Sequence, residues 1–320
     1  MRHCSKALAV RAMEVFESHG YDTGADIMGV KKETMRRYVR QARNDIGEQG
    51  EQIDESVIRQ IRERYTDAEL KAIARGGNSL PTPKKPAVSF DGEVVTIGLM
   101  TDTHIGSKYT DDYNITRAFE IFADNNVDMI CHCGDVFEGM SNRTGHVYEC
   151  TEIGYAAQLG RGKDIFSEWT DTDIYMIDGN HDRWFAQSVG AHIVSDLCDS
   201  QDNLIFLGHD EGDIDVNGAC VRLWHGLDAS SYAISYRIQK LVESFTGGNK
   251  PNVLLLGHVH KAGYIFDRHV HCISAGCIQS QSKWMRGKRI AAHTGFWIVS
   301  LTINNAGVAA VETKFFPFYE

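Results

Sequence analysis

The sequence is short of proline and lacks several patterns that would indicate familiar functions. Only five of its 320 residues are proline. No apolar run approaches the ~20 residues that span a membrane. The chain has no G-x-S-x-G elbow and no P-loop, so a serine hydrolase or a nucleoside-triphosphate-binding protein finds no support. Its eight cysteines include no C-x-x-C pair, which leaves zinc ribbons and redox motifs without support.

The remaining composition is that of an ordinary folded protein, with 42% hydrophobic residues, 24% charged residues and a net charge of −10. We expect no signal peptide at the start of the chain. Cys131 and Cys133 lie in a predicted buried strand, where we expect reduced thiols. Together these features predict a cytoplasmic protein with no membrane partner.

Three of the five prolines lie in residues 81–86, which favours a semi-rigid linker and a domain boundary. Residues 47–80 are polar, with apolar positions at helical spacing, so we expect helices that dock on a neighbour or form a homo-oligomer. The predicted division is residues 1–46 as a small all-α module, residues 47–87 as connector and linker, and residues 88–320 as the main domain.

The N-terminal module has the pattern of a helix-turn-helix. Residues 6–19 carry an apolar helical stripe, Thr23 begins a second short helix, and Gly29 supplies a tight turn before a third helix over residues 31–43. The third helix holds six basic residues and one acidic residue, which suits contact with a DNA backbone. The candidate DNA contacts are Lys31, Lys32, Arg36, Arg37, Arg40 and Arg43. The alternative is a solvated basic face on a small helical bundle.

The main domain predicts a mixed sheet, because strands and helices alternate at first and strands alone follow. The predicted helices are residues 113–123, 153–169, 184–197 and 232–245. The strands of the alternating part are residues 94–100, 129–133, 174–177, 221–224 and 253–256. The later strands are residues 263–266, 269–274, 296–301 and 308–316.

Polar side chains follow each of the five alternating strands at the point where it ends. Since such strand ends converge on one edge of a sheet, we expect one site built from five segments. The candidate metal ligands in these segments are Asp102, His104, Asp135, Asn180, His225, His258 and His260. Two carboxylates, one amide and four imidazoles suit first-row divalent metals. Seven groups exceed the four of a tetrahedral zinc site, so we expect two divalent cations, manganese first, with iron, zinc or magnesium as alternatives.

Five short motifs carry a family resemblance that covers roughly residues 94–318. Asp102-Thr103-His104, Gly134-Asp135-Val136-Phe137-Glu138, Gly179-Asn180-His181-Asp182, Trp224-His225-Gly226 and Gly257-His258-Val259-His260 resemble, in this order, the motifs of the calcineurin-like metallophosphoesterases. The resemblance implies an α/β fold in which two packed sheets are flanked by helices.

The same resemblance implies a role for each residue. One metal would be held by Asp102, His104, Asp135 and His260, and Asp135 would bridge to a second held by Asn180, His225 and His258. A hydroxide between the two ions would attack the phosphorus, and His181 would protonate the leaving oxygen. Glu138 and Asp182 are both candidates to orient His181, or else ordinary loop carboxylates. Glu138-Gly139-Met140 replaces the Asp, Arg and Gly of the related protein phosphatases, which argues against that activity.

Two features favour DNA as the substrate. Residues 101–106 resemble the opening motif of the double-strand-break repair nucleases, and the segment beyond His258 resembles the small exonuclease-type subunit of archaeal family-D DNA polymerases. The basic run 279–289 contains Trp284, which suits phosphate contact and base stacking. The alternative is a basic surface hairpin with Trp284 packed inward. Arg143, Arg161 and Arg183 are placed near the site by motif proximity.

We therefore predict a two-metal DNA phosphodiesterase, a 3′–5′ nuclease brought to DNA by the helix-turn-helix. This combination of a DNA-binding module with a nuclease-like domain is expected of a bacterial or phage protein. The first alternative is a phosphomonoesterase or cyclic-nucleotide phosphodiesterase whose helical module serves oligomerisation. The second alternative, a non-catalytic DNA-binding or assembly protein on a phosphoesterase scaffold, is disfavoured by the complete set of candidate ligands.

Overall fold

The computed structural model describes residues 6–48, 86–227, 233–245, 249–305 and 307–319. The chain divides into two compact units, Met1–Thr82 and Pro83–Glu320. Most of the predicted connector and linker, residues 49–85, lies outside the described residues, and so does the oligomerisation surface predicted there. Within the described residues, no helix combines the length and apolarity needed to cross a membrane.

The first unit contains the three helical segments that the sequence predicts. Helix α1 (Lys6–Met28) is interrupted at Gly20, whose φ of 69° and ψ of −177° are not helical, so it consists of two helices. Gly29, with a φ of 64°, makes the turn into α2 (Lys32–Glu48). The buried side chains that hold the segments together are Ala12, Phe16, Ala25, Met35 and Val39.

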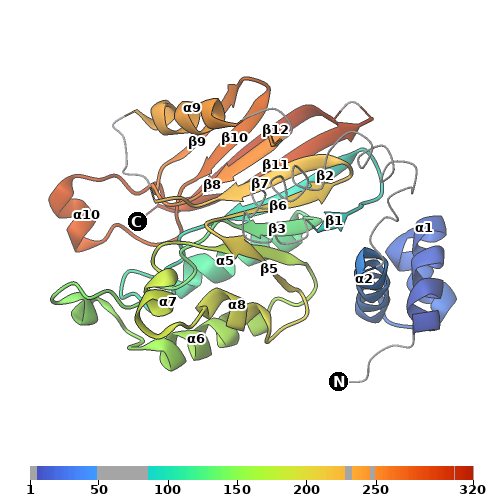
Figure 1. Ribbon diagram of the computed structural model, residues 1–320, viewed down its shortest axis with the longest axis horizontal. Coiled ribbons are helices and arrows are strands. Elements are labelled where there is room, and N and C mark those ends of the chain that lie inside the picture. Colours follow the sequence, from blue (N-terminus) through green and yellow to red (C-terminus); the bar gives the residue numbers. More distant parts are fainter. Residues whose placement is uncertain (1–5, 49–85, 228–232, 246–248, 306, 320) are drawn as a thin grey trace, which may run out of the picture. The chain divides into compact units, whose positions relative to one another are not determined.

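The second unit is a sandwich of two six-stranded sheets flanked by helices, which confirms the predicted fold class (Figure 1). The first sheet has the order β12-β11-β2-β3-β4-β5. Its strands are β2 (Val94–Met100), β3 (Met129–His132), β4 (Ile174–Asp178), β5 (Leu204–His209), β11 (Gly295–Asn304) and β12 (Gly307–Pro317). The second sheet has the order β1-β6-β7-β8-β10-β9. Its strands are β1 (Ala87–Val88), β6 (Glu211–Val216), β7 (Ala219–Trp224), β8 (Val253–Leu256), β9 (Ala262–Asp267) and β10 (Val270–Ala275).

Helices cover the outer face of each sheet. Those beside the first sheet are α5 (Asp112–Asp124), α6 (Tyr155–Ser167), α7 (Arg183–Val189) and α8 (Ile193–Cys198), and α9 (Ile234–Ser244) lies on the second (Figure 1). A 3-10 helix, η1 (His146–Glu149), and α10 (Lys283–Lys288) lie in the loops. Strands β2 to β5 pair in parallel, so their carboxyl ends share one edge.

Both faces of the central strands are buried, which explains their nearly continuous apolar sequence. Ile97 and Leu99 of β2 point into the core between the sheets, whereas Met100 points into the core beneath the helices. Gly98 lies where Phe122 of α5 packs, and a Cβ there would come within 2.8 Å of the ring. The absence of a side chain at Gly98 therefore lets α5 approach the sheet closely.

Three local expectations were wrong. The helix predicted over residues 184–197 is two helices, because Gly190 adopts a left-handed conformation, with a φ of 72°, and ends α7. The predicted set of strands also omitted β5 and β6; β5 contains a glycine, and β6 contains a glycine and three acidic residues. The alternative of a hairpin for residues 279–289 is also wrong, because these residues contain α10, which Ser282 caps by accepting from the Met285 N–H at 3.2 Å.

We predict that Phe122→Ala destabilises the second unit by about 3–5 kcal/mol, because the fully buried ring packs on Phe119 and Phe296. Tyr113→Ala is the matched control on the same helix, since Tyr113 is 72% exposed, and its effect should stay within about 0.5 kcal/mol. Urea unfolding measures both free energies. Equal losses in the two variants would contradict the packing described.

Candidate metal centre

The loops that follow β2, β3, β4, β7 and β8 bring the seven predicted ligands together; we call them the central cluster. Asp102, His104 and His260 form one group of potential ligands, and Asp135, His225 and His258 form another. In each group the ligand atoms lie within 4.8 Å of one another. The central cluster therefore assembles from five segments far apart in the sequence.

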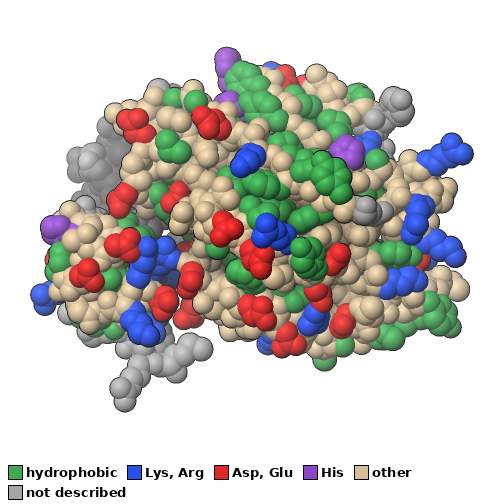
Figure 2. Space-filling view, turned by 180° about the vertical axis from the view of Figure 1, so that it is seen from behind, with side chains coloured by type: hydrophobic (Ala, Val, Ile, Leu, Met, Phe, Trp, Pro, Cys, Tyr) green, Lys and Arg blue, Asp and Glu red, His purple; other side chains and the backbone are tan. Residues whose placement is uncertain are grey.

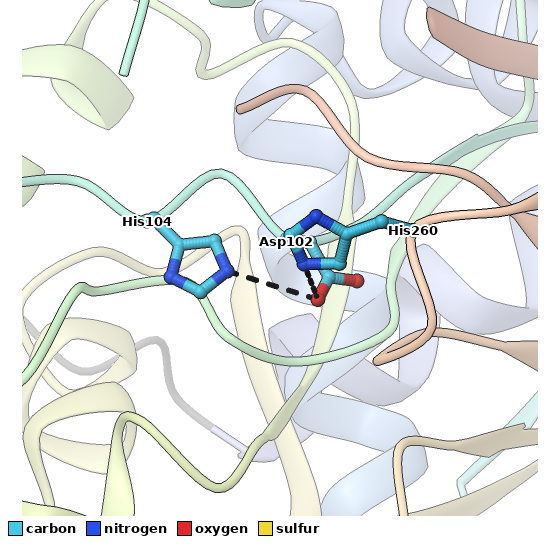
Figure 3. A group of neighbouring side chains, drawn as sticks. All are labelled: Asp102, His104 and His260. Atoms are coloured by element: carbon cyan, nitrogen blue, oxygen red, sulfur yellow. Dashed lines mark ion pairs between the residues drawn. The ribbon is translucent and has the colours of Figure 1, made fainter. Parts of the chain in front are cut away.

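The carboxylates lie between the imidazoles. Asp102 Oδ1 is 3.0 Å from His260 Nε2 and 3.8 Å from His104 Nε2, and Figure 3 shows both rings directed at this carboxylate. Asp135 Oδ2 is 3.8 Å from His104 Nε2 and 3.2 Å from His225 Nε2, so this carboxylate faces both groups. The side-chain oxygen of Asn180 lies 3.2 Å from His225 Nε2.

Five of the seven ligands have left-handed backbone conformations, which residues other than glycine adopt rarely. The φ angles are 51° at Asp102, 48° at His104, 49° at Asp135, 78° at His258 and 53° at His260. Each such conformation costs about 1–3 kcal/mol and persists only where the surroundings impose it. The strand ends are therefore bent sharply so that consecutive loops direct their side chains inward.

Hydrogen bonds between the loops impose these conformations. The Asp102 N–H donates to Gly134 O at 3.0 Å, and the His104 N–H donates to Asp135 O at 3.0 Å. The His258 N–H donates to Asp102 Oδ2 at 3.0 Å, which fastens the β8 loop to the β2 loop.

Glycine is required where the loops touch. A Cβ at Gly179 would lie 2.2 Å from Asp135 Oδ1, and one at Gly134 would lie 2.6 Å from His225 Nδ1. Any side chain at either position would displace a candidate ligand.

The donor atoms of the central cluster fit divalent cations. Asp102 Oδ1 and His104 Nε2 are buried and have no hydrogen-bond partner in the described part of the chain. Burial would raise the pKa of Asp135, but His225 and other imidazoles hold it well below its ordinary range. Burial would lower the pKa of His225, but the Asp135 carboxylate raises it to about 9. The site thus keeps its carboxylates ionised and attracts protons to its imidazoles. A metal cation can bind the same buried groups in place of those protons.

His181 lies beside the central cluster. His181 Nδ1 is 2.9 Å from the backbone oxygen of Glu138, and Trp184 packs on the imidazole with ring centroids 4.0 Å apart. Burial lowers the pKa of His181 to about 4, against the raising effect of Asp135. His181 also belongs to a group of potential metal ligands with His104 and Asp135. The structure therefore places the predicted acid in contact range of the metal site.

Glu138 is the carboxylate that joins the surrounding groups. Its Oε2 lies 3.1 Å from His104 Nδ1, and its Oε1 lies 2.9 Å from His146 Nε2. Oε2 is 3.9 Å from His181 Nδ1, so the carboxylate lies near the imidazole. The hydrogen bond to the His181 ring is made by the backbone oxygen of Glu138. Although burial would raise the pKa of Glu138, contacts with His104 and His146 lower it well below its ordinary range. Glu138 therefore contacts His181 through its backbone oxygen, and its carboxylate lies nearby.

Asp182 has a different position from the one expected of a partner for His181. Its carboxylate accepts hydrogen bonds from the backbone N–H groups of Val136, Phe137 and Gly179, at 3.1, 2.8 and 2.8 Å. These bonds join the loops after β3 and β4. Asp182, one of the two candidates to orient His181, has the contacts expected of the alternative, an ordinary loop carboxylate, because its oxygens accept from backbone amides.

Two contributing residues carry no motif in the sequence. His146 is 1% exposed, and its Nε2 lies 2.9 Å from Glu138 Oε1. Gln279 Nε2 also approaches Glu138 Oε2, at 3.4 Å. The pairing of His146 with Glu138 spans eight residues of loop, and no regular spacing signals it. An acidic residue in the metal motif followed by an unassigned histidine was the only available sequence signal.

A pocket of about 620 Å³ opens above the central cluster. Its walls include Tyr109, Arg143, Trp184 and Trp284. The expectation of an inward-packed Trp284 is wrong, because the side chain is 50% exposed at the pocket. Figure 2 shows Lys and Arg side chains gathered at its right-hand end, which corresponds to the α10 end of the second unit in Figure 1.

Of the three arginines placed near the site by motif proximity, Arg143 lines this pocket, where it pairs with Glu149 at 2.5 Å. Arg161 pairs with Asp112, and Arg183 pairs with Asp210. Neither Arg161 nor Arg183 is among the residues that line the pocket. Arg143 is therefore the arginine placed to meet a ligand there.

Comparison with known proteins identifies a family. The calcineurin-like phosphoesterase superfamily domain matches residues 95–294. Similar solved structures include an archaeal phosphodiesterase, with 19% identity, 69% of this chain and 100% of that chain covered, and a TM-score of 0.42. The phosphoesterase YfcE from E. coli has 16% identity and a TM-score of 0.38, with 68% of this chain and 98% of that chain covered. Vacuolar protein sorting 29 from Cryptosporidium parvum has 15% identity and a TM-score of 0.38, with 72% of this chain and 100% of that chain covered. No curated protein matches the chain.

We predict that Glu138→Gln weakens divalent-metal binding by about 10- to 100-fold, because the carboxylate that orients His104 loses its charge. Glu149→Gln is the matched control, since Glu149 lies in the same loop and pairs with Arg143 rather than with a candidate ligand. Calorimetric titration with manganese measures both affinities. Unchanged binding by Glu138→Gln would show that the carboxylate has no role in positioning His104.

Proposed function

The chain belongs to the calcineurin-like phosphoesterase superfamily, and we propose that this metal-dependent phosphoesterase is a DNA phosphodiesterase of the 3′–5′ exonuclease type. The observation that carries the proposal is the pocket above the central cluster, with Trp184, Trp284 and Arg143 in its walls. Its volume of about 620 Å³ lies within the range of sites that enclose whole organic ligands. The aromatic walls favour a nucleotide over a bare phosphate group.

The proposal assigns two divalent ions to the central cluster, with manganese first. One would be held by Asp102, His104 and His260 and the other by Asn180, His225 and His258, with Asp135 shared. When bound, such ions polarise phosphoryl oxygens and make water a nucleophile at neutral pH. By holding the ions, the carboxylates and imidazoles of the chain would determine where the phosphate group lies.

His181 supplies the proton in this proposal. The Glu138 carbonyl can only accept a hydrogen bond, so Nδ1 of His181 carries a hydrogen and Nε2 is left to hold the transferred proton. The negative charge of a bound phosphodiester would raise the pKa that burial lowers. Trp184 packs on the ring and limits its rotation. Nε2 then delivers its proton to the oxygen that leaves phosphorus.

DNA is favoured by the groups at the pocket rim. Trp284 offers a half-exposed ring for a base, and α10 adds Lys283, Arg286 and Lys288 for the phosphates on either side. The motif of residues 101–106 and the resemblance to the exonuclease subunit support the same substrate.

The first unit would deliver the enzyme to DNA. Lys31, just before α2, and Arg37 within it are exposed. Lys32 pairs with Asp22 at 2.7 Å, and Arg36 lies over the ring of Tyr21. Met35 and Val39 on the other side of the helix are fully buried. The helix thus presents one basic side and buries the other, as a recognition helix does. The side chain of Arg43 lies outside the described residues.

We expect the wild-type protein to cleave bis-p-nitrophenyl phosphate and end-labelled DNA with manganese, and chelator or His181→Asn to abolish cleavage. His269→Asn, a change in an exposed histidine, is the matched control and should retain activity. Hydrolysis of p-nitrophenyl phosphate alone would establish a phosphomonoesterase instead. No hydrolysis of any substrate would favour the non-catalytic scaffold.

Trp284→Ala should raise the KM for single-stranded DNA by about 5- to 150-fold, because one base loses the aromatic ring on which it stacks. Trp284→Phe keeps an aromatic face and should recover most of the affinity. Both KM values come from steady-state cleavage assays. If alanine and phenylalanine behave alike, stacking at this position is not part of substrate binding.

Arg37→Gln in the full chain should reduce the slope of log affinity for double-stranded DNA against log salt by about one, because one phosphate contact is lost. Lys240→Gln, on the exposed side of α9, is the control and should leave the slope unchanged. Fluorescence anisotropy across salt concentrations gives both slopes. An identical slope for Arg37→Gln and wild type would remove Arg37 from the DNA contacts.

A further inference from the structure

A second group of histidines lies outside the central cluster, at the neighbouring strand ends of the first sheet. Asp178 is the last residue of β4, His209 is the last residue of β5, and His192 precedes the first residue of α8. We call these three residues the outer cluster. One donor atom from each lies within 4.8 Å of the other two.

The carboxylate of the outer cluster is fixed, and its imidazoles are open to solvent. Asp178 is 3% exposed, its Oδ1 accepts from the Asp210 N–H at 3.0 Å, and its Oδ2 lies 2.6 Å from His209 Nδ1. The rings of His192 and His209 lie together, with centroids 4.6 Å apart. The buried carboxylate thus holds His209 directly, and His192 lies against the ring of His209.

The outer cluster is separate from the central cluster although the two share a strand end. The backbone oxygen of Asp178 faces the central side, where a Cβ at Gly134 would come within 3.0 Å of it. The Asp178 side chain is directed instead to β5, through His209. No residue of the outer cluster is among the seven candidate ligands of the central cluster.

The charges around the outer cluster favour a cation. Asp178 contributes a carboxylate, and Arg183, the basic residue on the adjoining turn of α7, is paired with Asp210. Because Arg183 is paired with Asp210, it does not pair with the Asp178 carboxylate. The two imidazoles and the carboxylate remain as potential donors.

We propose that Asp178, His192 and His209 bind a further divalent ion of the zinc class, independently of the phosphoesterase site. Two imidazole nitrogens with one carboxylate oxygen make a zinc ligand set that leaves a fourth position for water. Zinc bonds of about 2.0–2.2 Å require donor atoms roughly 3.3 Å apart in a tetrahedron. The three donor atoms lie within 4.8 Å of one another, and both imidazoles are exposed, so their side chains have room to turn toward an ion.

An ion at the outer cluster would fasten β4 to β5 and to the start of α8. Asp178 ends β4, and the loop that follows it carries Asn180, a candidate metal ligand, and His181, the proposed acid. The outer ion would therefore hold the end of β4 from which this loop starts. The outer ion thus supports the loop of the central site from behind.

Zinc titration of the metal-free full-length protein tests the outer cluster. The double variant His192→Ala/His209→Ala should bind one zinc equivalent fewer than wild type, measured by calorimetry and by metal analysis after gel filtration. His269→Ala, which removes another exposed histidine, should bind as many equivalents as wild type. The difference of one equivalent does not depend on how many ions the central cluster holds, nor on whether the protein hydrolyses DNA.

A variant of the central cluster separates the two sites. Asp135→Asn should lose zinc from the central cluster but keep the one zinc equivalent bound by the outer cluster, which His192→Ala/His209→Ala lacks. Equal zinc content in wild type and the double variant would overturn the proposal. So would loss of the outer equivalent in His269→Ala, because the binding would then be a general property of surface histidines.

Discussion

The geometry of the metal centre depends on left-handed backbone at its ligands. Asp102, His104, Asp135, His258 and His260 all adopt it, and none is a glycine. A single chain segment cannot hold such residues at low cost, so each loop is held by its neighbours. The Asp102 carboxylate accepts from the His258 backbone, and the Asp102 backbone donates to Gly134. The strain of each loop is thus balanced by hydrogen bonds from another.

The same interlocking connects the metal centre to the pocket. Glu138 contacts His104 on the metal side, His146 on the pocket side and His181 through its backbone. Trp184 packs on His181 and makes an edge contact with His146, with centroids 5.3 Å apart. A candidate metal ligand, the proposed acid and the pocket wall are therefore joined by direct contacts, which suits chemistry that requires fixed positions.

The sequence predicted the fold and the central cluster because both depend on local patterns. The apolar runs of β2 and β8 match their predicted limits, and the polar residue after each run marks the edge of the sheet. It did not predict His146, Gln279 or the outer cluster, because their contacts join loops with no regular spacing. The short helix α10 has too few turns for a periodic pattern, and the break at Gly190 needed knowledge of its backbone conformation.

Anomalous diffraction from crystals grown with manganese tests the central claim most directly. The account predicts two peaks in the central cluster, one contacted by Asp102, His104 and His260 and the other by Asn180, His225 and His258. Asp135 should contact both. A single peak, or two peaks that do not share Asp135, would contradict the arrangement of a metal pair across these five loops.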